Sequence, residues 1–198
     1  MRIDRVVTSG LFTLAAEPIP VDNNVWLVGD DERVLVIDAG HQTEPIVAGI
    51  GARTVEAIVC THGHNDHIDA AVSLAGLVGA PIALHPADRM LWDRVYPERA
   101  PDRDLADGDT VEIGSGRLTV IHTPGHTPGS VCLRAEGELF GGDTLFNGGP
   151  GATQFEFGDE ATILESIRTR LFVLPHTTVV YTGHGDTTTI GAEAQRMT

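Results

Sequence analysis

Residues 60–69 read CTHGHNDHID, and this stretch places three histidines and an aspartate within six positions: His62, His64, Asp66 and His67. Side chains at positions i and i+2 of an extended loop point the same way, so His62 and His64 can bind one metal ion. Asp66 and His67 stand at the turn into a predicted helix and can face a second ion. This one loop therefore predicts two neighbouring metal sites.

Three further metal-capable side chains stand where other predicted strands end: His126 in TPGHTPGS, Asp143 in FGGDTLF and His184 in YTGHGD. An aspartate can bridge two cations about 3.5 to 4 Å apart, because each of its oxygens can bind one of them. We therefore predict two ions with a shared water or hydroxide between them. One takes His62, His64, His126 and Asp143, and the other takes Asp66, His67, His184 and Asp143.

Short β-branched runs alternate with helical patterns, and each polar cluster falls at the C-terminal end of a predicted strand. Residues 55–60 predict a buried strand that leads into the histidine cluster, and residues 159–174 predict the clearest amphipathic helix. Residues 25–29 and 33–40 predict a hairpin. Further strands are predicted at residues 81–85, 109–114, 117–123, 131–135, 138–143 and 178–183. Further helices are predicted at residues 43–50, capped by Thr43, at 69–79, capped at Asp69 or just before, and at 86–95, opened by Pro86.

No linker or long block of charge divides the 198 residues, so we predict one domain over residues 1–198. The 28 acidic and 13 basic residues give a formal charge of −15, and every basic residue is an arginine. This charge disfavours phosphate backbones and anionic membranes. We expect a small-molecule substrate, no nucleic-acid or membrane partner, and leave a homodimer open. The N-terminus lacks the apolar block of a signal peptide, and two cysteines give no disulfide framework, so a cytoplasmic location is expected.

The motif His62-x-His64-x-Asp66-His67, followed in order by His126, Asp143 and His184, resembles the metallo-β-lactamase superfamily along nearly the whole chain. The resemblance implies an α/β fold, an αββα sandwich of two mixed β-sheets flanked by helices, with the metal site at one edge. It also implies that Asp38, which ends the run VLVIDAG, holds the metal loop by orienting a ligating imidazole. Asp66 is expected to orient the nucleophile as well as to bind metal.

Within this superfamily, the segments HTPGHTPGS, GGDTLF and TGHGDTTTIGAE are most similar to the short bacterial branch of glyoxalase II-like enzymes, the hydroxyacylglutathione hydrolases. True β-lactamases of this fold usually carry another residue in place of His67 or Asp143, and the di-iron flavoproteins carry a glutamate in place of His64. RNA-processing members have basic surfaces or extra domains. These departures disfavour the other branches for this acidic chain.

The resemblance predicts a thioester hydrolase that cleaves an S-acyl conjugate of a low-molecular-weight thiol. Two divalent metal ions are expected, zinc first, with iron or manganese as alternatives. A persulfide dioxygenase with a single iron is the rival function, and His62, His126 and Asp143 would suffice for it. Hydrolysis of a lactone or another ester is a further alternative, because the same hydroxide would serve. A binding module with a dead site is disfavoured, because no ligand is missing.

The other chemically capable residues receive plainer interpretations. Cys60 and Cys132 are expected to be inert core thiols, and the glycine-rich residues 146–154 are expected to form a mobile rim beside the metals rather than a phosphate loop. Substrate carboxylates could be held only by arginines on predicted rims, although such side chains are usually solvated; the candidates are Arg89, Arg94, Arg99 and Arg103. Four histidines are assigned to the surface or to the support of the site: His41, His85, His122 and His176.

Overall fold

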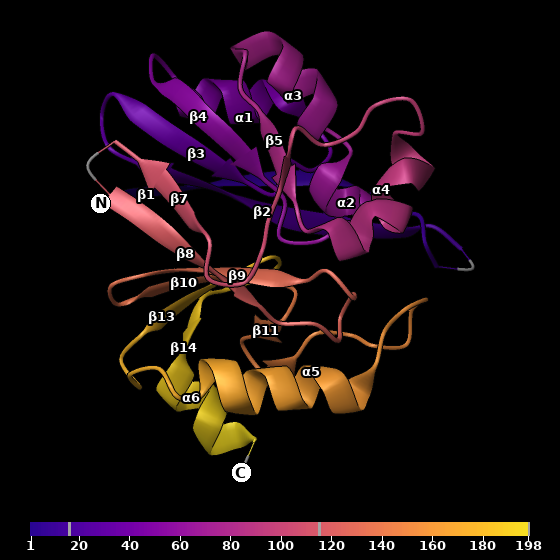
Figure 1. The fold of residues 1–198 in the computed structure, drawn as a ribbon, viewed down its shortest axis with the longest axis vertical. Coiled ribbons are helices and arrows are strands. Elements are labelled where there is room, and N and C mark those ends of the chain that lie inside the picture. The colour runs from indigo at the N-terminus through magenta and orange to yellow at the C-terminus, as the bar shows by residue number, and fades with distance from the viewer. Residues whose placement is uncertain (16, 115, 198) are drawn as a thin grey trace.

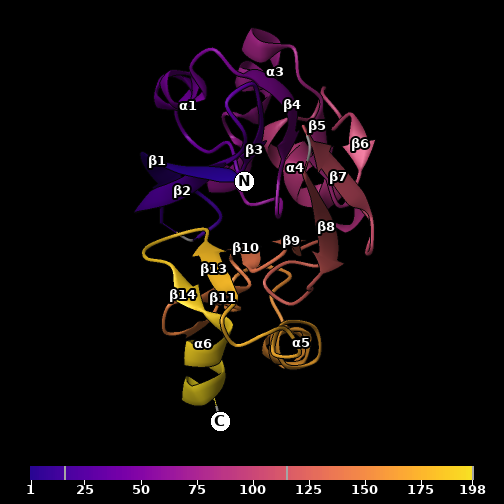
Figure 2. The ribbon, with the colours of Figure 1, turned by 90° about the vertical axis from the view of Figure 1, so that its left-hand side faces the viewer.

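Two six-stranded sheets pack face to face, and helices cover the outer face of each (Figures 1 and 2). The computed structural model describes residues 1–15, 17–114 and 116–197. Figure 1 shows α1 to α4 at the top, over the first sheet, and α5 and α6 at the bottom, over the second sheet. This arrangement is the predicted αββα sandwich of two mixed sheets.

The first sheet has the strand order β1-β2-β3-β4-β5-β6. Antiparallel pairing joins β1, β2 and β3, and parallel pairing joins β3, β4, β5 and β6. The predicted hairpin is therefore confirmed as β2 and β3. The strands are β1 (Arg2–Phe12), β2 (Ile19–Gly29), β3 (Arg33–Ile37), β4 (Thr54–Val59), β5 (Ile82–Leu84) and β6 (Arg103–Asp104).

The second sheet has the order β14-β13-β10-β9-β8-β7, and only the β10–β13 pair is parallel. Its strands are β7 (Thr110–Ile113), β8 (Gly116–His122), β9 (Val131–Ala135), β10 (Glu138–Gly142), β13 (Val179–Thr182) and β14 (Thr188–Thr189). The glycine-rich segment contributes a small hairpin of β11 (Leu145–Phe146) and β12 (Gly149–Pro150).

The helices connect the strands and cover the sheets. They are α1 (Thr43–Ile50), α2 (Asn65–Ile68), α3 (Ala71–Val78), the 3₁₀ turn η1 (Pro86–Asp88), α4 (Arg89–Val95), α5 (Glu160–Ser166), the π turn η2 (Ile167–Leu171) and α6 (Ile190–Arg196). Within the described residues, no helix is long and apolar enough to cross a membrane.

Two predicted helix caps are wrong. The residue before α1 is Gln42 rather than Thr43, and its side chain makes no capping hydrogen bond. Asp69 does not cap α3, because its carboxylate accepts a hydrogen bond from the backbone N–H of His41 instead. The predicted helix over residues 159–174 is shorter and ends in the π turn at Leu171.

Three layers of apolar side chains hold the sandwich together. In β2, Val25 and Leu27 face the helices of the first sheet, whereas Trp26 and Val28 face the second sheet. Alternate side chains of a strand point to opposite faces, so a strand buried on both faces reads as a continuous apolar run. The third layer lies between the second sheet and the helices α5 and α6, and Ile163 is part of it.

Polar bonds join the two sheets at the edge where the polar clusters lie. The side-chain amide of Asn24, in β2, donates to the carbonyl oxygen of Thr182 at 3.0 Å, and the indole N–H of Trp26 donates to the same oxygen at 3.0 Å. The backbone N–H of Val131 donates to the carbonyl oxygen of Thr61 at 2.8 Å. These bonds fix the end of β4 and the end of β13 against the opposite sheet.

Replacement of Phe140 by alanine tests the packing between the sheets. Phe140 is fully buried and stacks on Tyr181 with ring centres 4.9 Å apart. We expect F140A to lower the free energy of unfolding by about 3 to 5 kcal/mol, because the cavity cannot fully collapse. Leu77 is 67% exposed on α3, so L77A, measured in the same urea titration, should change stability by no more than about 0.5 kcal/mol. Equal effects of the two changes would contradict the sandwich core.

Candidate metal centre

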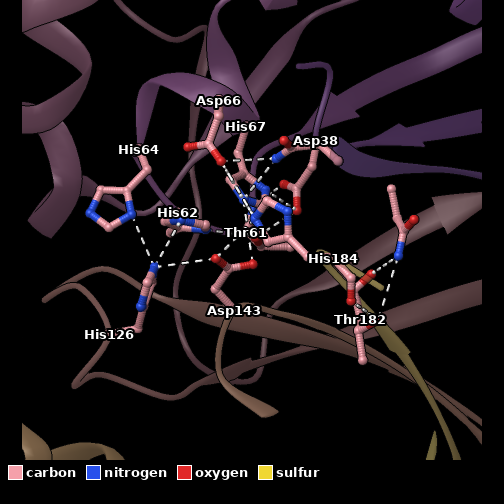
Figure 3. A network of polar contacts seen from close by, with 12 residues as sticks. Asp38, Thr61, His62, His64, Asp66, His67, His126, Asp143, Thr182 and His184 are labelled. Atoms are coloured by element: carbon pink, nitrogen blue, oxygen red, sulfur yellow. Dashed lines mark hydrogen bonds and ion pairs between the residues drawn. The ribbon is translucent and has the colours of Figure 1, made fainter. Parts of the chain in front are cut away.

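The seven predicted metal-binding side chains meet at one edge of the sandwich. They follow the C-terminal ends of four strands: the histidine motif follows β4, His126 follows β8, Asp143 follows β10 and His184 follows β13. Figure 3 shows these side chains pointing toward one another from both sheets. All are buried except His184, which is partly exposed.

Three imidazoles form one half of this cluster. Nε2 of His126 lies 3.2 Å from Nε2 of His62 and 3.0 Å from Nδ1 of His64. Three ring nitrogens therefore converge on one point, in a geometry in which each can offer a lone pair to a single cation.

Carboxylates and two further imidazoles form the other half. Nε2 of His67 lies 3.2 Å from Nε2 of His184, and Oδ2 of Asp66 lies 3.4 Å from the same His184 nitrogen. Asp66, His67 and His184 together form a second group whose ligand atoms are close enough to share an ion.

Asp143 lies between the two halves. Its Oδ2 is 3.6 Å from Nε2 of His126 and 3.4 Å from Nε2 of His184, while its Oδ1 is 3.4 Å from Nε2 of His67. The backbone of Gly183 comes so close that an added Cβ would collide with Oδ1 of Asp143, so only glycine fits there. One carboxylate thus faces the ring nitrogens of both groups, which is the arrangement of a bridging ligand.

Hydrogen bonds to the outer nitrogens set the tautomers of four of the imidazoles. Nδ1 of His67 lies 3.1 Å from Asp38, Nδ1 of His126 lies 2.7 Å from the carbonyl oxygen of Ala152, and Nδ1 of His184 lies 2.7 Å from that of Asp22. Since these partners are acceptors, each Nδ1 carries the proton. The inward Nε2 atoms are then free to act as ligands. His62 is held in the same way by the hydroxyl of Thr61.

The electrostatics of the two halves differ. Burial and repulsion from His126 lower the pKa of His64 to about 3, and burial also lowers the pKa of His126. Burial opposes protonation of His184 too, but Asp143 and Asp66 outweigh it and raise the pKa of His184 to about 10. One half therefore presents neutral imidazoles, and the other half attracts positive charge.

The residues present fit a pair of cations. Oδ1 of Asp66 and Oδ1 of Asp143 are buried and make no hydrogen bond. A buried carboxylate oxygen without a partner is costly, and ring nitrogens about 3 Å apart with facing lone pairs repel each other. A positive ion in each half would pair with the free carboxylate oxygens and accept the lone pairs of the ring nitrogens. The donor set therefore suits divalent metals that accept nitrogen and oxygen ligands.

Asp38 supports the histidine motif through hydrogen bonds, as the family resemblance implied. Its Oδ1 accepts the backbone N–H of Thr61 at 2.7 Å, and its Oδ2 accepts the Thr61 hydroxyl at 2.8 Å. The same Oδ2 faces Nδ1 of His67. Because Thr61 in turn contacts Nδ1 of His62, one carboxylate orients an imidazole in each half.

Asn23 was not predicted from the sequence, yet it lies against the site. Its amide nitrogen is 3.1 Å from Oδ2 of Asp66, and its amide oxygen is 3.0 Å from Nε2 of His41. His41 is held by Asp69 on its other side. The interpretation of His41 as a supporting histidine therefore agrees with its contacts, and no feature of the sequence pointed to Asn23.

Asp88 was also not predicted, and it joins the two loops that carry the three-imidazole half. Its Oδ2 accepts the backbone N–H of Gly63 at 2.8 Å and the hydroxyl of Thr127 at 2.6 Å, and its Oδ1 accepts the N–H of Gly129 at 2.6 Å. Cβ atoms added at Gly63 or Gly129 would press against Asp88, so both glycines allow the loops to approach it. Gly63 separates His62 from His64.

The remaining candidates lie outside the cluster. His85 and His122 stack on each other 4.2 Å apart, and His176 is exposed. Cys60 and Cys132 are both free and buried, as predicted for core thiols. Three of the four candidate arginines form ion pairs with acidic neighbours, and the fourth, Arg103, lines a different hollow. None of the four lines the cavity above the cluster, so their contacts agree with the plainer interpretation of solvated side chains.

A cavity of about 370 Å³ opens above the cluster. Five of the predicted metal ligands form its floor, and the glycine-rich segment lies at its rim, in the predicted place, through Phe146, Ala152 and Gln154. The rest of the wall is apolar. The floor residues are His64, Asp66, His126, Asp143 and His184.

A fold of two mixed sheets between helices, with a histidine and aspartate cluster at one edge, defines a class of metal-dependent hydrolases. Residues 18–184 match the family model described as the metallo-beta-lactamase superfamily. The chain belongs to this superfamily.

Similar proteins align with this chain over nearly its full length. The "Hydroxyacylglutathione hydrolase GloC" of Haemophilus influenzae is 35% identical over 199 residues, which cover 89% of this chain and 93% of the relative. The structure titled "TTHA1623 in a di-iron-bound form" is 31% identical, with a TM-score of 0.81 over 89% of this chain and 94% of that one. "BLEG-1 B3 metallo-beta-lactamase" is 30% identical, with a TM-score of 0.81 over 95% of this chain and 97% of that one.

Replacement of Asp88 by asparagine tests its role in holding the two loops. An amide offers one acceptor where the carboxylate offers two, so Gly63 or Gly129 loses its partner. We expect D88N to lower the affinity for zinc about 10- to 100-fold, measured by competition with a chelator. D93N is the matched control, because Asp93 lies on α4 with an exposed side chain. An unchanged affinity in D88N would contradict this role.

Proposed function

We propose that the protein is a binuclear metallohydrolase that cleaves an S-acyl conjugate of a low-molecular-weight thiol. The observation that carries this proposal is the convergence of seven ligand side chains into two groups that share Asp143. Zinc is the first candidate for both positions. Iron is the second, because a similar structure is described as di-iron-bound.

Divalent cations held in the two groups would lower the pKa of a shared water to near neutrality and so supply hydroxide at pH 7. The protein's own residues then position the reaction. Oδ1 of Asp66 is a buried acceptor without a partner, so it can hold one proton of the nucleophile and fix its direction. Asn23, which donates to Oδ2 of the same carboxylate, keeps Asp66 in that orientation.

The choice of a thioester follows from the leaving group. Among the residues that the structure describes, the titratable side chains lining the cavity all belong to the predicted metal ligands. No separate acid therefore stands ready to protonate a departing group. A thiolate can leave without protonation, since a thiol has a pKa of about 8.5, whereas an amine leaving from an amide needs a proton. The similarity to a hydroxyacylglutathione hydrolase supports the same choice.

The same argument disfavours β-lactam hydrolysis relative to thioester hydrolysis, because the leaving group of a β-lactam is an amine. One similar structure is nevertheless described as a B3 metallo-β-lactamase. The rival persulfide dioxygenase needs only one iron, so much of the cluster would bind no metal. Asp66, His67 and His184 would then be a buried group of charges with no ion to neutralise it. The carboxylate-rich half thus favours hydrolysis.

The proposed setting is a cytoplasmic enzyme acting on a small molecule. The formal charge of −15 disfavours nucleic acids and anionic lipid surfaces as partners. Both cysteines are free and buried, which suits a reducing compartment.

The test combines metal analysis with a panel of acyl-thiols. Protein purified without added metal and then loaded with zinc, iron or manganese should hold about two ions per chain. It should release thiol from at least one acyl-thiol. H64A should lose at least about 100-fold in kcat/KM, because it removes a ligand rather than a supporting group. H176A is the matched control, because that histidine is exposed and belongs to none of the ligand groups, and it should behave like the wild type.

Two results would overturn the proposal. One is the absence of any acyl-thiol that the wild type cleaves faster than H64A. The other is a single bound iron together with oxygen uptake on a persulfide, which would identify the dioxygenase instead.

A further inference from the structure

Apolar side chains from three separate segments wall the cavity above the metal centre. They come from the end of β1, the start of β2 and the segment from β11 to α5. These residues are Phe12, Ile19, Val21, Phe146 and Phe155. Their convergence over a polar floor is the usual composition of a site that binds an apolar group beside a reacting centre.

Phe12 and Phe155 form a rigid aromatic corner over His64. Their rings meet edge to face with centres 4.7 Å apart, and the Phe12 ring lies 5.3 Å from the imidazole of His64. Phe12 is almost fully buried, so this corner is set before any ligand arrives. Edge-to-face packing is a favourable arrangement for aromatic rings, which keeps the surface in place.

The opposite wall lies over the other half of the cluster. The ring centre of Phe146 lies 6.0 Å from that of the His184 imidazole. Ile19 and Val21 extend this apolar wall. Ile19, the first residue of β2, is 43% exposed. Both sides of the metal centre are therefore apolar.

Among the residues that the structure describes, no arginine lines this cavity. Arg94 is paired with both oxygens of Glu156 at 2.8 and 2.9 Å. Arg5 lies near the mouth, but it donates to the side chain of Asn24 at 2.8 Å and to the carbonyl oxygen of Gly185 at 3.0 Å. A carboxylate held against the apolar walls would lose its hydration without gaining a charged partner.

We propose that this cavity selects thioesters with an apolar, uncharged acyl group on a thiol without carboxylates, in preference to conjugates of glutathione. This selection rests on the proposed thioester hydrolysis. The acyl chain packs against the aromatic corner or the aliphatic wall while the carbonyl faces the metal-binding floor. Glutathione carries two carboxylates, and the walls of the cavity offer neither of them an arginine.

Kinetics on matched thioesters test the selection. Acetyl, butanoyl and hexanoyl groups are placed on N-acetylcysteamine, which is uncharged, and on glutathione. We expect kcat/KM to rise about fourfold for each methylene that the cavity buries. We also expect every neutral thioester to be cleaved faster than its glutathione counterpart. No dependence on chain length, or a preference for glutathione, would overturn the inference while leaving the proposed hydrolysis intact.

Variants locate the effect in the cavity. F155A should flatten the dependence on chain length, whereas F157A, which removes a neighbouring ring outside the cavity, should leave it unchanged. Gln154 is exposed at the rim, so Q154R should raise kcat/KM for the glutathione thioester and Q154E should not. If F155A and F157A behave alike, the aromatic corner does not select the acyl group.

Binding measurements separate this inference from the proposed reaction. The S-hexyl thioethers of N-acetylcysteamine and of glutathione cannot be hydrolysed, so calorimetry reports on the cavity alone. The neutral thioether should bind more tightly than the glutathione thioether, and F155A should weaken the binding of the neutral thioether. If no thioester is cleaved but this order of binding holds, the proposed hydrolysis fails and the selectivity of the cavity stands. If the glutathione thioether binds more tightly, the selectivity fails whatever the reaction.

Discussion

The whole site depends on the burial of ring nitrogens and carboxylate oxygens that face one another at the edge of the sandwich. Such a cluster is unfavourable alone, because facing lone pairs repel and buried oxygens of Asp66 and Asp143 lack partners. The three apolar layers of the fold supply the stability that tolerates it. Cations are the natural counterpart to this arrangement. The fold can thus be understood as a rigid frame that holds an electrostatically strained cavity open for metal.

Two buried aspartates outside the cluster hold the loops that carry several of the predicted ligands. Asp38 orients His67 directly and His62 through Thr61, while Asp88 ties the loop around Gly63 to the loop that follows His126. The ligands sit on loops, and the two loops that carry His62, His64 and His126 are anchored by short hydrogen bonds to Asp38 or Asp88 inside the fold. Precision at the metal centre therefore comes from these supports as much as from the strands.

The sequence predicted what spacing and strand ends can reveal. The motif around His62, the αββα arrangement and the support by Asp38 were all accessible, because each has a local pattern or a family resemblance. The strand β1 was missed, since its residues Arg2–Phe12 mix charged and apolar side chains along a half-exposed edge. Asn23 and Asp88 were missed because the residues of the histidine motif that they contact lie 43 and 25 residues away, and no short motif encodes such contacts. The cap at Asp69 was wrong because its carboxylate serves His41 instead.

The most direct test is anomalous diffraction from crystals of the zinc-loaded protein. We expect two peaks about 3.5 to 4 Å apart, both in contact with Asp143. One should be bound by His62, His64 and His126, and the other by Asp66, His67 and His184. A single peak, or side chains turned away from each other with no density between them, would contradict the binuclear centre.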